Sequence, residues 1–221
     1  MESSRIDPSV FRRWSLPLLC AVQGGERFAF LAMLPLFVLY AQERYGIAAP
    51  KALLILALFQ MLVYLGGLPG GWLADRALGT RKATLLGAAL LACGYGPLAL
   101  DRGELLWPTL LMMVLGHSTF HPGLHVLLAR VADADEKARE RVFLWHYLAA
   151  KLGYAAGALF GEWAHARAGW RLLFAGATAA SAVAVMLLIT GLPWLRAQAR
   201  RAVDEPARIV RSSDTANMHA V

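Results

Sequence analysis

Two long apolar runs of this chain are joined by the charged stretch GGWLADRALGTRK, residues 70–82. The side chains of Asp75, Arg76, Arg81 and Lys82 cannot lie in hydrocarbon at low cost, so the chain must reach the membrane surface here and turn back within a few residues. Gly79 is expected to form the turn, because glycine adopts a positive φ without strain. The stretch therefore predicts a short loop between two membrane helices.

The same stretch has the form G-x-L-A-D-R-x-x-G-x-R-K, in which the fixed places are taken by Gly71, Asp75, Arg76, Gly79, Arg81 and Lys82. This pattern resembles the loop between helices 2 and 3 of major facilitator superfamily transporters, where it takes part in the conformational change. A chance charged loop would rarely keep two glycines, one acid and three bases in these places. The resemblance implies an all-α membrane protein with half of a major facilitator fold, in which six transmembrane helices form two inverted three-helix repeats.

The composition agrees with a membrane protein. Of the 221 residues 58% are hydrophobic and 17% are charged, and the mean hydropathy is +0.49, which is more apolar than a soluble domain of this length. The net charge of +7 is scattered in short segments without a basic stripe, so we expect no nucleic-acid partner. Cys20 and Cys93 lie in apolar runs and have neither disulfide nor metal spacing. We expect lipid contact, no cofactor and no enzymatic activity.

Six runs are long enough to cross hydrocarbon, which takes about 20 helical residues. These runs are residues 15–40, 52–74, 82–100, 105–129, 141–164 and 170–192. We therefore predict a cytoplasmic N-terminal segment (1–14), a six-helix transmembrane bundle (15–192) and a polar, mobile cytoplasmic tail (193–221).

The basic residues predict the orientation of these helices. Of the 22 Lys and Arg residues, fifteen fall in segments on the side of both termini and the 70–82 loop, and five fall on the other side. Cytoplasmic segments carry the excess of Lys and Arg. The chain is thus expected to be a multi-pass protein of the cell (inner or plasma) membrane with both termini in the cytoplasm.

An internal repeat links the second and fifth runs. The spacing of Gly71, Ala74, Asp75, Gly79 and Arg81 recurs in Gly161, Ala164, His165, Gly169 and Arg171. The two copies are predicted on opposite sides of the membrane, as inverted three-helix repeats require.

Charged residues lie near the middle of the first run. Gln23, Glu26 and Arg27 belong to the sequence QGGERF, which resembles the E-x-x-E-R motif of the proton-dependent oligopeptide transporter (POT/PTR) family, with Gln23 in place of the first glutamate. The resemblance implies that these residues handle the proton and contact substrate. The alternative is a buried pair that only fixes helix packing.

The resemblance to that family continues at three further positions. Tyr64 falls where the family has a substrate-facing tyrosine, although an interior tyrosine that only finds a hydrogen-bond partner would fit equally well. His121 stands where the family has a peptide-binding lysine, and Lys151 stands in place of an asparagine. Lys151 lies about 15 Å from either end of its helix, so it must face the cavity or pair with an acid, for which Glu26 is the candidate.

His117, His121 and His125 recur every fourth residue and line one face of the fourth run. Such histidines could relay protons, a role we consider for His117 and His125, or bind a metal. We prefer a polar stripe to a metal site, because no Cys or acid stands nearby in the sequence to complete one.

Glycines are spaced for close helix packing on two runs. Gly153, Gly157 and Gly161 follow one another at every fourth residue, and Gly67 and Gly71 repeat that interval. In the superfamily these helices face a second six-helix half, so the glycines are predicted to form that interface. The alternative is packing within the same half.

The leading hypothesis is a half-sized secondary active transporter for proton-coupled uptake of small peptides or related solutes. We expect it to work as a homodimer or with a separately encoded second half. One alternative is a non-transporting membrane subunit or truncated fragment. Another is transport of a metal or other solute along the histidine face.

Overall fold

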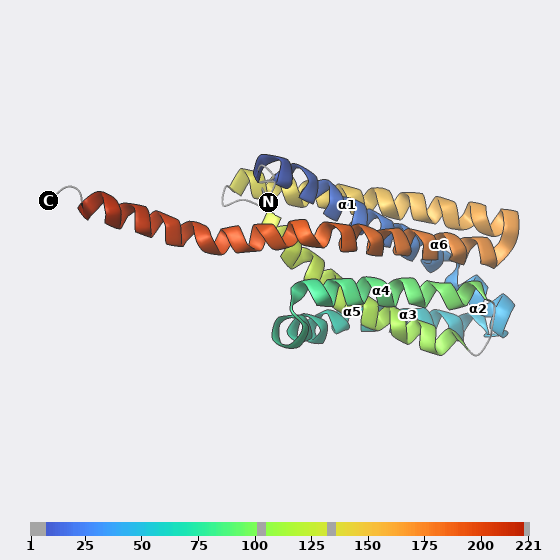
Figure 1. Cartoon of the computed structure of the whole chain (residues 1–221). Helices are drawn as coiled ribbons and strands as arrows, with labels where there is room; N and C mark the ends of the chain where they lie inside the picture. Colours follow the sequence, from blue (N-terminus) through green and yellow to red (C-terminus); the bar gives the residue numbers. More distant parts are fainter. Residues whose placement is uncertain (1–7, 101–104, 132–135, 219–221) are drawn as a thin grey trace.

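The structure, a computed structural model, describes residues 8–100, 105–131 and 136–218 (Figure 1), and these contain helices and no strand. The elements are α1 (Pro8–Met33), η1 (Leu34–Leu36), α2 (Phe37–Tyr45), α3 (Ala49–Leu73), η2 (Ala74–Leu78), α4 (Thr80–Ala99), α5 (Leu106–Val131) and α6 (Glu136–Met218). Helix α6 is interrupted by non-helical backbone at Ala168 and Gly169. We call residues 136–167 its first arm and residues 170–218 its second arm; Figure 1 shows the two arms running back along each other.

Within the described residues, four helical stretches are long and apolar enough to cross a membrane. They are Ser15–Tyr45, Ala49–Leu78, Thr80–Ala99 and Arg139–Gly191, and the last contains both arms of α6. Helix α5 is not among them, because its histidines, serine and threonines lower its hydropathy, yet its 26 residues suffice to cross hydrocarbon. Each of the six predicted runs lies within a helical stretch, so the predicted all-α fold is confirmed.

The first predicted run is not one regular helix. A 3₁₀ turn at Leu34–Leu36 carries Pro35 at its start and separates α1 from α2. Proline lacks a backbone N–H and clashes with the preceding turn, which accounts for the break.

Both copies of the repeat end in a glycine with a positive φ angle. Gly79 has φ +74° and Gly169 has φ +69°, a region that L side chains rarely adopt, so glycine is required where each pair of helices reverses. The alanines at equivalent positions, Ala74 and Ala164, are both buried. The turn predicted at Gly79 is confirmed. The side chain of Asp75 lies outside the described residues.

The loops fall into two groups at the two ends of the bundle. At one end Arg130 of α5 lies 3.5 Å from the Thr80 hydroxyl beside the 70–82 loop. At the other end the Trp170 indole donates a 2.9 Å hydrogen bond to Glu43. This grouping agrees with the one used to count basic residues. Which end faces the cytoplasm stays a prediction.

The glycines predicted as an interface pack inside this bundle instead. A Cβ at Gly153, Gly157 or Gly161 would meet the backbone of α1. The respective α1 partners are Gly24, Phe28 and Ala32. The interface role predicted for these three glycines is wrong, because their missing side chains are what let α6 approach α1 closely.

The two predicted interface glycines of α3 differ from each other. A Cβ at Gly71 would touch Pro122 of α5, whereas one at Gly67 would have no described atom within 4 Å. Gly66 and Gly70, one residue earlier, lie against Ser118 of α5. Small residues thus bring α3 onto α5 as they bring the first arm of α6 onto α1. This pairing is expected if α3 corresponds to the first arm of α6, and α5 to α1, in two inverted repeats.

The ends of the chain depart from the predicted boundaries. The backbone of α1 is helical from Pro8, and residues 1–7 of the predicted N-terminal segment lie outside the described residues. The second arm of α6 continues as helix to Met218 and leaves the bundle (Figure 1), while the mobile cytoplasmic tail stays a prediction. Strong helix formers that extend an existing helix need no new nucleus.

Replacing Gly157 with Ala should destabilise the protein, because the new Cβ would meet the Phe28 backbone and force α1 and α6 apart. The matched control is Gly67→Ala, whose Cβ faces open space and should be neutral or slightly stabilising. Overpacking typically lowers the free energy of unfolding by about 1–3 kcal/mol. Thermal unfolding in detergent measures both variants, and equal midpoints would contradict the packing described here.

Candidate functional site

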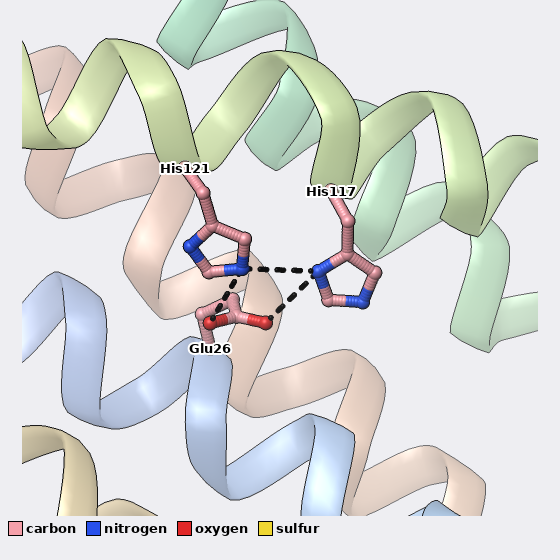
Figure 2. Close-up of side chains that lie close together, drawn as sticks. All are labelled: Glu26, His117 and His121. Carbon is pink, nitrogen blue, oxygen red and sulfur yellow. Dashed lines mark hydrogen bonds and ion pairs between the residues drawn. The ribbon is translucent and has the colours of Figure 1, made fainter. Parts of the chain in front are cut away.

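Glu26 lies deep in the bundle because small residues beside it allow close packing. A Cβ at Gly24 would lie 3.4 Å from the Ala149 carbonyl oxygen in the first arm of α6, and a Cβ at Gly25 would lie 3.4 Å from that of Ala180 in the second arm. Helix α1 is therefore held between both arms. The Glu26 side chain points toward the two histidines of α5 (Figure 2), and the residue is only 2% exposed.

The Glu26 carboxylate has three polar neighbours. Its Oε2 lies 3.3 Å from Nε of Arg27, and its Oε1 lies 3.3 Å from Nδ1 of His117. Nε2 of His121 is 3.7 Å from Oε2 (Figure 2). A carboxylate is stable at this depth only when its charge is paired or when it takes up a proton.

Arg27 connects this buried cluster to a more open region. Its Nη2 lies 2.9 Å from Nε2 and 3.1 Å from Nδ1 of His121, and its guanidinium carbon is 5.3 Å from the centre of the Tyr154 ring. The Arg27 side chain is 17% exposed. The guanidinium thus touches the buried acid on one side and an aromatic face on the other.

Lys151 is exposed and lies between two tyrosines of the first arm of α6. Its Nζ is 5.0 Å from the centre of the Tyr147 ring and 5.6 Å from that of Tyr154. Among the described residues no ion pair joins Lys151 to Glu26, because Arg27 takes that place. Of the two alternatives for Lys151, pairing with Glu26 is therefore not found among the described residues. The tyrosines could have been found from their i−4 and i+3 spacing to Lys151.

Tyr64 is 78% exposed on α3, so it is not an interior tyrosine that packs in the core. The Tyr154 ring is shared by the exposed Lys151 and by Arg27. Gln23 is buried, and its Oε1 has no hydrogen-bond partner among the described residues.

The three predicted histidines differ in their surroundings. His117 is buried and stacks on His121 with ring centroids 5.4 Å apart, while His125 is exposed. His146 of α6 adds a fourth ring, 5.6 Å from that of His125. Sequence reasoning missed His146 because it lies on another helix. The expectation that no acid stands near these histidines is wrong, because helix packing brings Glu26 to them.

The loop motif lies apart from this cluster, at one end of the bundle. Arg76 is placed over the Trp72 ring, with its guanidinium carbon 5.7 Å from the ring centre, while Arg81 is partly buried and Lys82 exposed at the start of α4. Thr80 is buried against α5 through its contact with Arg130. The loop is thus anchored to the end of α5, the helix that carries His117 and His121.

Comparison with known proteins identifies the class. A family model for the Major Facilitator Superfamily matches residues 19–214, and the chain belongs to this superfamily of membrane transporters. The family consists of transporters and not of enzymes, and the long apolar helices of this chain make it a multi-pass membrane protein. Dipeptide and tripeptide permease A of Proteus mirabilis (strain HI4320) is 26% identical to it over 197 residues, which cover 88% of this chain and 40% of the permease.

Solved structures place the fold among peptide transporters. A structure of the peptide transporter POT in complex with sulfate matches with a TM-score of 0.79 at 22% identity, covering 96% of this chain and 49% of that one. A structure of tetrameric PepTSo2 matches with a TM-score of 0.67 at 23% identity, covering 87% of this chain and 42% of that one. The resemblance to the POT family is confirmed. The chain spans about two fifths of the length of the curated relative reported above.

Replacing Arg27 with Gln should destabilise the protein, because the buried Glu26 carboxylate then loses its cation. Leaving a buried charged group unpaired lowers the free energy of unfolding by about 1–3 kcal/mol or more. The double variant Glu26→Gln/Arg27→Gln should recover part of this loss, and Arg76→Gln, which removes an exposed arginine, serves as the control. Thermal unfolding at neutral pH measures all three. An Arg27→Gln variant as stable as Arg76→Gln would show that the pair contributes nothing.

Proposed function

We propose that the chain takes part in proton-coupled uptake of small peptides across the inner membrane. The observation that carries this proposal is the Arg27 guanidinium, which pairs with a buried acid and also reaches the open region beside Tyr154. The named activity of the similar permease, dipeptide and tripeptide transport, supports the same substrate class.

Coupling would follow from competition for Arg27. When Glu26 is ionised, it holds the guanidinium at 3.3 Å. When Glu26 takes up a proton, that attraction disappears and Arg27 is free to bind the carboxylate of a peptide, for which a guanidinium has matching bidentate geometry. Peptide and proton would then bind together and leave together. His121, which Arg27 also contacts, would help to hold the guanidinium between these two positions.

Lys151 would supply the second cationic group for the substrate. Its charge is held by two tyrosine faces and by no described acid, so it can meet an anionic group without first breaking an ion pair. Tyr64 and Tyr154 would complete the region with hydroxyl groups and aromatic surface. Gln23 lies one helical turn before Glu26 and would contribute its amide to the same site.

Transport also needs a second six-helix bundle, because alternating access moves one bundle against another around a site near the midplane. We propose a homodimer or an association with a separately encoded second half. Helix α3 presents a large exposed apolar face for this contact, which includes Leu54, Leu58, Met61, Leu62, Leu65 and Leu68. Gly67 lies on the open part of this helix. The termini are proposed to face the cytoplasm, following the distribution of basic residues.

The competing function is that of a membrane subunit that does not transport. Proteoliposomes containing the purified chain should take up a labelled dipeptide faster with an inward proton gradient than without one. The same measurement on Glu26→Gln, which cannot exchange the proton, should lose the gradient dependence. Absence of uptake both by the chain alone and with a co-expressed second half, with normal folding, would favour the subunit.

Lys151→Gln should weaken dipeptide binding by at least about tenfold, because a carboxylate in a poorly hydrated site loses one compensating charge. The matched control is Lys51→Gln, which removes an exposed lysine at the start of α3. Ligand-dependent shifts in thermal unfolding report binding for both. If the two variants bind the dipeptide equally well, Lys151 does not contact the substrate.

A further inference from the structure

Three ligand atoms converge in the buried cluster of Figure 2. They are a carboxylate oxygen of Glu26, Nδ1 of His117 and Nε2 of His121, and all lie within 4.8 Å of one another. The two histidines come from one face of α5 and the acid comes from α1. These atoms already pair with one another, and three electron-pair donors that converge in this way can also bind one cation.

The spacing of these atoms fits a particular coordination. The His117 nitrogen is 3.3 Å from Glu26 Oε1 and 3.3 Å from the His121 nitrogen, and the His121 nitrogen is 3.7 Å from Glu26 Oε2. Ligand atoms bonded to a tetrahedral zinc ion at its usual bond lengths lie about 3.3–3.5 Å from each other. The pair of histidine nitrogens already has this spacing, and a rotation of the Glu26 carboxylate would bring one oxygen toward both of them. We propose that Glu26, His117 and His121 form a binding site for a divalent transition-metal ion, with zinc as the ion of choice.

The donor set selects the class of ion. Two imidazoles and one carboxylate suit zinc, cobalt or nickel, whereas magnesium and calcium prefer oxygen ligands alone. Histidines at i and i+4 on a helix present their nitrogens on one side, an arrangement that zinc sites on helices use. Three protein ligands leave a fourth position for a water molecule or another group.

The position of the Arg27 side chain determines whether a metal ion can bind at the cluster. Its guanidinium lies within hydrogen-bonding distance of His121 and 3.3 Å from Glu26, so a divalent cation at the cluster would repel it. The Arg27 side chain is partly exposed and already borders the Tyr154 ring, which gives it a place to move. Metal binding and the Glu26–Arg27 pair are therefore alternatives.

Zinc titration of the full chain tests the site without measuring transport. Metal-free protein purified in detergent should bind one zinc ion per chain in calorimetry. We expect zinc binding to weaken on the order of 100-fold in each of three variants, Glu26→Gln, His117→Ala and His121→Ala. Loss of a metal ligand should cost at least as much affinity as loss of a group that only holds a ligand in place. His125→Ala is the matched control, from the same helix, and should bind like the original protein. Arg27→Gln should bind more tightly, because it removes the competing cation.

Cobalt binding can be measured on the original protein, so this test does not depend on whether the variants fold. Bound in the original protein, Co²⁺ should show the intense visible absorption of a tetrahedral ion, and equimolar zinc should remove it. No zinc binding, or binding without this absorption, overturns the proposal. So does an affinity that falls in His125→Ala and His146→Ala but not in His117→Ala, because the ion would then sit on other histidines. Since no step uses a peptide or a proton gradient, failure here leaves the proposed transport untouched.

Discussion

The structure depends on the accommodation of one carboxylate in the middle of a membrane bundle. An ionised Glu26 surrounded by hydrocarbon would be unstable by several kcal/mol, so its neighbours must provide charge or hydrogen bonds. Arg27 does so from the same helix, and His117 and His121 do so from α5. Binding of a proton, a peptide or a metal ion, as proposed above, would in each case change the partner of the Glu26 carboxylate or of Arg27.

Glycine packing is what brings these partners together. Gly24, Gly153, Gly157 and Gly161 let α1 and α6 touch through their backbones, and Gly66 and Gly70 do the same for α3 and α5. In lipid there is little hydrophobic driving force between helices, so such close contact supplies much of the association energy. With α1 fixed against α6, Glu26 faces the histidines of α5. The stability of the bundle and the geometry of its site therefore have one origin.

The bundle separates a buried acid from exposed cationic and aromatic groups. Glu26 and His117 are enclosed, while Lys151 and Tyr64 lie in the open, and Arg27 lies between these regions. An exposed lysine in a membrane helix is costly next to lipid but favourable beside water or an anion. This contrast is the physical reason to expect a second bundle that would enclose the open region, in keeping with a chain that covers 49% of one solved peptide transporter.

The sequence alone determined the helical fold, the six apolar runs and the turn at Gly79, and it marked Glu26, Arg27 and His121 as candidate site residues, because hydropathy, glycine and intramembrane charge each act locally. The sequence could not show which helix faces pack against each other. Gly153, Gly157 and Gly161 have the spacing for close packing with any helix, and only the folded chain shows that they face α1. In the same way Glu26 and His117 are ninety-one positions apart in the chain. Only helix packing makes them neighbours and leaves Lys151 exposed and apart from Glu26.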